Sequence, residues 1–149
     1  MYRRYKGNFK VKNPQIYKGN PSNIIYLSLM ELRFMKWCAS SEKIFQWNSE
    51  EIVIPYISPI DNKRHRYFPD FLIQTSKGWF LIEVKPSIES KPPKKLVVET
   101  LTLKKKRRYN RAVRTWLVNE AKWTAAKKVC KIEGWEFQII TEKQLTPDK

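Results

Sequence analysis

Three residues in the middle of the chain have the types and spacing needed for phosphodiester hydrolysis. Asp70 stands in the run Arg66-Tyr-Phe-Pro-Asp-Phe-Leu-Ile, and Glu83 follows thirteen residues later in Glu83-Val84-Lys85. Two carboxylates beside an ammonium group form a hard-oxygen Mg²⁺ site with a neighbouring cation. Such a site can activate water for attack on a phosphodiester.

Two predicted strands bring these groups together. The runs 67–74 and 79–84 are rich in aromatic and β-branched residues, and Ser76-Lys77-Gly78 between them favours a turn. Alternate residues of a strand share a face, so Glu83 and Lys85 point to one side. A hairpin can then gather the three groups at one end of a sheet. The spacing alone is also compatible with two amphipathic strands whose charges are solvated.

The composition describes one globular domain with a polyanionic partner. The 149 residues suffice for a single core, and a hydrophobic fraction of 42% excludes a disordered chain. Thirty Lys and Arg against fourteen Asp and Glu leave a formal charge of +16. This favours nucleic acid, although a basic balance can also serve solubility alone. No membrane contact is expected, because no amphipathic anchor, lipidation motif or membrane-length apolar run is present.

The two cysteines and the single histidine do not form a metal site. Cys38 and Cys130 lie far apart and outside any zinc-binding pattern, so we expect free thiols in a reducing cytoplasm. His65 has no histidine or cysteine partner at ligand spacing. We expect it to be a surface or phosphate-contacting residue.

Residues 1–21 are predicted to form a basic N-terminal arm ahead of a nuclease domain at 22–149. Cations and aromatic residues alternate in the arm, whereas Gly7, Pro14, Gly19 and Pro21 prevent a regular helix. Such an arm either contacts a nucleic-acid backbone and exposed bases or lies draped on the domain.

A helix is expected from an N-cap at Ser22 or Asn23 to about residue 39. Its apolar positions recur at helical spacing: Ile24, Leu27, Met30, Phe34 and Trp37 with Cys38. Glu31 falls close to this face, where an unpaired carboxylate is costly. Either a metal site at the sheet edge or a salt bridge, for example to Arg33, would compensate it.

The chain on either side of the Asp70 hairpin is predicted as follows. Residues 45–57 read as one long strand, in which Pro55 favours an edge or a bulge. Residues 86–95 are broken by prolines and form a loop beside the proposed site. The five cations at 104–108 are either a solvated face or a seat for a phosphate backbone.

A helix over 110–133, an end at Gly134 and a strand over 135–141 complete the chain. The buried stripe of this helix is expected at these positions: Ala112 or Val113, Trp116 or Leu117, Ala121, Ala125 and Val129. The element order predicts an α/β fold with a mixed, mostly antiparallel sheet flanked by helices. That order resembles the restriction-endonuclease-like core.

Pro69-Asp70 and Glu83-Val84-Lys85 resemble the signature of the PD-(D/E)xK nuclease superfamily, and Glu31 would supply an upstream third carboxylate. Over most of its length the chain also resembles the head-completion nucleases of T-even-type tailed phages. More distantly, Glu31, Asp70, Glu83 and Lys85 are similar to the site residues of phage Holliday-junction resolvases and transposon-end nucleases. The motifs shared with the head-completion family are Asn23–Tyr26 with Ser28 and Glu31, Ser49–Tyr56, Ser58–Asp61, His65–Phe71, Glu83–Pro86, Asn119–Trp123, Ala125-Ala126, Gly134–Phe137 and Thr141-Glu142.

The resemblance implies a virion-assembly enzyme that acts on DNA after packaging, when the filled head is made ready for tail attachment. It implies portal or neck proteins as partners, with action in the host cytoplasm or on the virion, as a monomer or a homodimer. Two other functions remain open. One is a non-catalytic DNA-binding assembly protein at the portal, and the other is a structure-specific resolvase acting as a dimer.

We expect Mg²⁺, with Mn²⁺ as an alternative, to be held by Asp70, Glu83 and the backbone carbonyl of Val84. Glu31 would reach the same ion through water or help to bind a second one. Lys85 would lower the pKa of the attacking water or stabilise the charge of the transition state.

DNA is expected to be held by its phosphates and not read by its bases, since no recognition-helix or zinc-finger pattern appears. The predicted phosphate contacts are Arg3, Arg4, Lys94, Lys95, Lys104, Lys105, Lys106, Arg107, Arg108 and Lys122.

Overall fold

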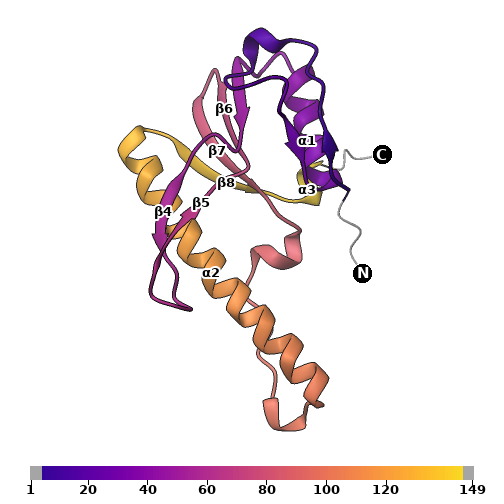
Figure 1. The fold of residues 1–149 in the computed structure, drawn as a ribbon, viewed down its shortest axis with the longest axis vertical. Coiled ribbons are helices and arrows are strands. Elements are labelled where there is room, and N and C mark those ends of the chain that lie inside the picture. The colour runs from indigo at the N-terminus through magenta and orange to yellow at the C-terminus, as the bar shows by residue number, and fades with distance from the viewer. Residues whose placement is uncertain (1–4, 146–149) are drawn as a thin grey trace.

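A four-stranded sheet forms the centre of the molecule. The structure is a computed structural model that describes residues 5–145. The strands are β3 (Gln46–Ser49), β6 (Phe71–Thr75), β7 (Gly78–Val84) and β8 (Glu136–Ile140), in the order β3-β6-β7-β8. All neighbours are antiparallel except β7 and β8, which α2 (Leu103–Glu133) joins as a parallel pair (Figure 1). The predicted mixed, mostly antiparallel sheet with a crossover helix is confirmed.

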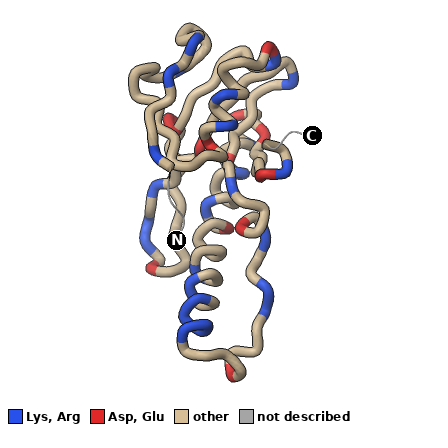
Figure 2. The backbone as a smooth tube through the Cα atoms, turned by 90° about the vertical axis from the view of Figure 1, so that its right-hand side faces the viewer, with Lys and Arg blue, Asp and Glu red and all other residues tan. Residues whose placement is uncertain are grey.

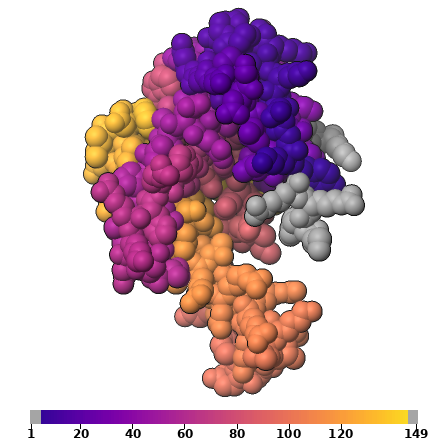
Figure 3. Space-filling view, viewed as in Figure 1, coloured from indigo at the N-terminus to yellow at the C-terminus, as the bar shows by residue number. Residues whose placement is uncertain are grey.

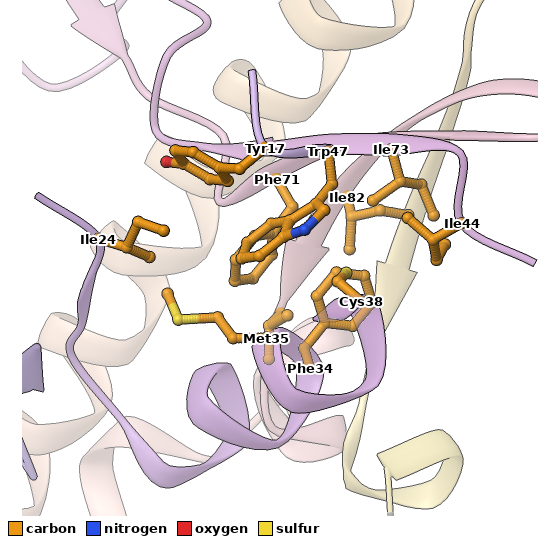
Figure 4. Packing of buried hydrophobic residues seen from close by; sticks show 11 residues of the cluster. Tyr17, Ile24, Phe34, Met35, Cys38, Ile44, Trp47, Phe71, Ile73 and Ile82 are labelled. Carbon is orange, nitrogen blue, oxygen red and sulfur yellow. The ribbon is translucent and has the colours of Figure 1, made fainter. Parts of the chain in front are cut away.

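Helices cover both faces of this sheet, because its central strands bury side chains on both sides. Phe71 and Ile73 of β6 join a cluster with residues of α1 (Leu29–Ser40), including Phe34 and Met35, as Figure 4 shows. Leu72, between them in the sequence, points to the other face and joins a second cluster with α2. The result is a three-layer arrangement in which the sheet lies between α1 and α2.

The described part of the predicted arm packs on the domain. Strand β1 (Gly7–Asn8) pairs with β2 (Ile25–Tyr26), and a 3₁₀ turn η1 (Pro14–Ile16) leads to Tyr17. The Tyr17 side chain is buried, with its ring 4.8 Å from the ring of Trp47. Of the two alternatives for residues 5–21, the structure favours the draped one.

The long strand expected over 45–57 is wrong, because it divides at Glu50 into strands of different sheets. Glu50 has a left-handed φ of 55°, a conformation that interrupts a strand in a non-glycine residue. Beyond it, β4 (Ile54–Ile57) and β5 (Arg64–Tyr67) form a separate two-stranded ribbon that packs against α2. Pro55 lies in this ribbon, which fits the predicted edge position.

The first predicted helix begins five or six residues later than expected. Ser28 is the N-cap, and its Oγ accepts a hydrogen bond from the Glu31 N–H at 3.1 Å. The residues proposed as its first turns form β2 instead. The predicted cap at Ser22 or Asn23 is therefore wrong, and the signal that marks the true start is the Ser28-x-x-Glu31 capping box.

Helix α2 is longer than expected and buries a different face. It begins after the N-cap Thr102, so the cations at 104–108 are helical. The buried residues are Asn119, Trp123, Ala126 and Cys130. The predicted stripe is rotated from these positions, and part of it packs at the margin of the second cluster: Trp116, Ala121, Ala125 and Val129. Gly134, with φ of 77°, ends the helix as predicted.

The first half of α2 stands away from the body of the molecule. Together with the preceding loop, it forms a projection of residues 91–115, visible in Figures 1 and 3. None of these residues is buried, and the loop contains only the short 3₁₀ turn η3 (Val98–Thr100). Two further short elements are η2 (Ser87–Ser90), which follows β7, and α3 (Glu142–Leu145), which follows β8.

Candidate functional site

Asp70 is placed by the segment that links the ribbon to the central sheet. Pro69 before it is fully buried, and the Asp70 carbonyl accepts a hydrogen bond from the Glu50 N–H at 3.1 Å. The carboxylate Oδ2 accepts the Val84 N–H at 2.7 Å. The first of these hydrogen bonds fixes the main chain at Asp70, and the second holds its carboxylate against the end of β7.

Glu83 and Lys85 point to the same side of β7, as strand alternation predicts. The Glu83 side chain is buried, its Oε2 accepts a 2.6 Å hydrogen bond from the Tyr67 hydroxyl, and its Oε1 lies 3.8 Å from Lys85 Nζ. Tyr67 is the last residue of β5, so the ribbon reaches into the site and orients one of its carboxylates.

Glu31 comes to the same site from the first turn of α1. Its Oε2 accepts the Leu27 N–H at 3.0 Å, so the side chain folds back on the helix start as in a capping box, but reaches the residue before the N-cap Ser28. Burial raises the pKa of the Glu31 carboxyl, and the charges of Glu50 and Glu83 raise it further. Glu31 is thus both a helix cap and a member of an acidic cluster.

The carboxylates repel one another in a site that is partly shielded from water. The pKa of Asp70 lies well above its ordinary value, first because the group is buried and then because Glu83 and Glu31 lie near. Burial also raises the pKa of Glu83, while Tyr67 and Lys85 oppose the rise. Negative charge is concentrated here beyond what one or two lysines neutralise, which is an electrostatic reason for a cation to bind.

Lys122 lies at this cluster and not on the projection with the other predicted phosphate contacts. Its Nζ stands 5.6 Å from the centre of the Tyr67 ring and 5.9 Å from that of Tyr56. Burial lowers the pKa of Lys122, and the charge of Lys85 lowers it further, while Glu83 counteracts this. The site therefore contains a second lysine, contributed by α2.

Sequence reasoning missed Tyr67, Glu50 and this position of Lys122. Tyr67 precedes Phe68-Pro69-Asp70, and strand alternation could have placed it near Glu83 only with the register known. Glu50 follows β3, and burial raises the pKa of its carboxyl although part of the side chain is exposed. Its place near Glu31 arises from the bend that ends β3, for which the sequence has no glycine signal.

The donor set suits a hard divalent cation, although the side chains do not enclose one as they stand. Within residues 5–145, no three acidic, histidine or cysteine side chains are arranged to hold a metal ion together. Asp70 and Glu83 each spend one oxygen on a hydrogen bond, to Val84 and Tyr67, which leaves a second oxygen in each carboxylate. Carboxylate oxygens of this kind are the ligands that Mg²⁺ prefers.

The remaining predicted phosphate contacts lie apart from the carboxylates. Lys94 and Lys95 are on the loop of the projection, and Lys104 to Arg108 are on the first turns of α2, where Figure 2 shows a concentration of Lys and Arg. Arg3 and Arg4 lie outside the described residues. His65 is exposed, as predicted, and pairs with Asp61 at 2.8 Å.

A mixed sheet between helices, with a PD-x(12)-ExK arrangement at the edge of its central hairpin, defines the restriction-endonuclease-like nucleases. The chain belongs to the family described as TnsA-like endonuclease N terminal, which matches residues 41–142. It is also 39% identical over 142 residues to the head completion nuclease of Enterobacteria phage T4, covering 95% of this chain and 93% of that protein. Within the described residues, no helix is both long and apolar enough to cross a membrane.

Proposed function

We propose that the protein is a Mg²⁺-dependent deoxyribonuclease, with Mn²⁺ as an alternative metal. The observation that carries this proposal is the convergence of Glu31, Asp70, Glu83 and Lys85 from α1, the β5–β6 link and β7. Asp70, Glu83 and the backbone carbonyl of Val84 would hold the ion, and Glu31 would act through water or at a second ion. The bound metal would supply an activated water and neutralise phosphate charge.

Other groups of the chain would position the carboxylates and stabilise the transition state. Tyr67 fixes the rotamer of Glu83 through its hydrogen bond, and the Val84 N–H fixes Asp70. Lys85 places its amino group beside Glu83, where it can stabilise the extra negative charge of a phosphorane-like transition state. Lys122, held between two tyrosine rings, adds a second cation to the same small volume.

The biological setting follows from the T4 relative. Identity of 39% over nearly the whole of both chains supports the same task, which that protein's name gives as head completion. We therefore place the activity after DNA packaging and before tail attachment, in the host cytoplasm or on the virion, with portal or neck proteins as partners. Cations in the projection would bind the DNA phosphates.

Cleavage by the purified protein tests this function. Linear duplex, supercoiled circular and four-way-junction DNA are incubated with Mg²⁺, with Mn²⁺ and with a chelator, using wild type and Asp70→Asn. Metal-dependent cleavage that is lost in Asp70→Asn supports the proposal. DNA binding without cleavage by any metal would instead indicate a non-catalytic assembly protein. Strong preference for the junction, with a dimer in solution, would indicate a resolvase.

A further inference from the structure

Phe68, two residues before Asp70 in the chain, is a large apolar side chain that the fold leaves in solvent. It is 41% exposed, whereas its neighbours Tyr67 and Pro69 are buried. Tyr67 is tied to Glu83 and Asp70 to Val84, so the backbone on both sides of Phe68 is held in place. Packing does not explain this position, because burial of a phenylalanine would stabilise the fold and exposure forgoes that gain.

Two arginines precede Phe68 on one face of β5. In an extended strand, residues two apart point to the same side, which places Arg64 and Arg66 in one row, and Phe68 is the first residue after the strand. The Arg66 guanidinium lies 5.7 Å from the centre of the Phe68 ring, in agreement with this alternation. His65 points to the other side, where its ring lies 5.8 Å from that of Tyr56.

Neither arginine forms an ion pair within the described residues. Both are exposed, and the ion pairs found within residues 5–145 involve only His65 with Asp61 and Lys85 with Glu83. The row therefore presents two cations without an ion-pair partner and then an aromatic ring, and it ends two residues before Asp70 in the chain. Figure 2 shows the basic residues of the ribbon on a strand pair separate from the basic half of α2.

The chemistry of this row fits single-stranded DNA. Phosphates need cations, and an aromatic face binds a nucleobase only when that base is unstacked from its neighbours. Bases inside an intact duplex are stacked and do not offer their faces. Arg64 and Arg66 supply the first requirement and Phe68 the second, and all three come shortly before Asp70 in the chain.

We propose that Arg64, Arg66 and Phe68 bind an unpaired stretch of the strand to be cut, with a nucleobase stacked on Phe68 next to the scissile phosphate. This proposal deepens the proposed nuclease function and rests on it, because a scissile phosphate exists only if the protein cleaves DNA. The preferred substrate is then DNA with unpaired nucleotides, such as an overhang or a single-stranded gap. Intact duplex would be the poorer substrate.

Binding is measured separately from cleavage, so that the two proposals can fail independently. In an Asp70→Asn background, fluorescence anisotropy gives the affinity for a labelled oligothymidylate and for a blunt duplex of the same length. The added variants are Phe68→Ala, Phe68→Leu and Phe68→Trp. Phe45→Ala is the matched control, because Phe45 is also exposed, at 53%, and lies just before β3, away from the ribbon.

Phe68→Ala and Phe68→Leu are expected to weaken oligothymidylate binding about tenfold, since both lack a π face, while Phe68→Trp keeps it. Duplex affinity and the Phe45→Ala control should stay unchanged. Changing Arg64 and Arg66 together to Gln should lower the salt slope of single-strand binding by about 0.7 per lost contact. Equal losses for duplex and single strand, or wild-type binding by Phe68→Ala, would overturn the proposal. These outcomes are readable even if wild type cleaves nothing.

In the catalytically intact protein, the same substitution gives a second readout. Phe68→Ala should slow cleavage of a duplex with a single-stranded overhang more than cleavage of a blunt duplex, about tenfold against little change. Loss of the overhang preference is the expected result. A uniform reduction on both substrates would show that Phe68 only supports Asp70, and the proposal would be wrong.

Discussion

The molecule has two groups of cations in different settings, one at the carboxylate site and one on the projection. Lys85 and Lys122 are partly buried beside carboxylates and aromatic rings. Lys104 to Arg108 lie mostly exposed on a half-helix that packs against little of the body (Figure 3). A charge in a partly dry site acts strongly on atoms close to it, whereas solvated charges attract a polyanion over a distance and are screened by salt.

We expect the two groups of cations to have different roles, one in the cleavage step and one in DNA binding. Loss of a cation at the carboxylate site should change the rate on bound DNA, and loss of cations on the projection should change how much DNA is bound. The position of Lys122 matters most here, because the sequence analysis predicted it as a phosphate contact and the structure places it beside the carboxylates.

The largest effect is expected from the carboxylates. Asp70→Asn and Glu83→Gln keep the side-chain shape and remove the charge that would hold the metal, so cleavage should fall by at least roughly 10²-fold. DNA affinity should stay the same or rise slightly, because a negative charge facing phosphate is lost. Cleavage is followed under single-turnover conditions, with thermal unfolding as the control for folding. Near-normal rates in both variants would contradict the proposed site.

The next largest effect is expected at Lys85 and Lys122. At saturating DNA, Lys85→Ala should lose roughly 10²-fold in rate and Lys122→Gln roughly tenfold, because both act on the transition state. The dissociation constant for DNA should change little in either variant. If Lys122→Gln altered only the affinity, Lys122 would act as the phosphate contact that the sequence predicted.

A smaller effect on rate and a larger one on binding are expected from the projection. Changing all five residues 104–108 to Gln should weaken duplex binding and flatten its salt dependence, by about 0.9 in slope for each lost phosphate contact. The rate at saturating DNA should remain near wild type. Binding isotherms between low and physiological salt measure the slope. A slope equal to that of wild type would show that these cations do not contact DNA.

The smallest effects concern stability without metal. The pKa of Asp70 is raised in the folded protein, so the folded state holds its proton to higher pH than the unfolded state does. The contribution of Asp70 to stability is therefore fully present below about pH 4, the ordinary carboxyl range, and is lost as the pH rises through the raised pKa. Asp70→Asn should remove that fall and melt at the same or a higher temperature at pH 7. Mg²⁺ should stabilise wild type more than the variant.

Ser28→Ala supplies the matched test of the α1 cap. It removes one hydrogen bond of the capping box and leaves the Glu31 carboxylate in place, so it should cost about 1 kcal/mol in stability with the rate per folded molecule unchanged. Glu31→Gln retains an oxygen for the Leu27 N–H and should show the reverse, intact stability with a higher Mg²⁺ requirement. A stability loss in Glu31→Gln with normal cleavage would assign Glu31 to the cap alone.

Local patterns predicted the hairpin that carries the site. The Ser76-Lys77-Gly78 turn joins β6 to β7, Glu83 and Lys85 share a face, and Gly78 and Gly134 have the positive φ values that their turns require. These features depend on residues close in sequence, through alternation and turn geometry. The capping box at Ser28 is equally local, so the late start of α1 could also have been predicted.

The features that the sequence did not reveal depend on contacts between distant segments. The break of the strand at Glu50 moves β4 and β5 out of the central sheet, and only then can Tyr67 reach Glu83. The buried face of α2 is chosen by the ribbon and the sheet that pack against it. The first half of α2 packs against neither of them and buries no side chain, and its polar sequence has no helical hydrophobic periodicity.

The sequence by itself determined the α/β class, the central hairpin and the set Asp70, Glu83 and Lys85, because short-range geometry and side-chain chemistry suffice for them. Tertiary structure alone decided that Glu31 arrives from the start of α1, that Tyr67 and Lys122 join the carboxylates, and that Phe68 stays in solvent. Those outcomes are set by how separate layers dock, and docking depends on which apolar surfaces the whole chain can bury together.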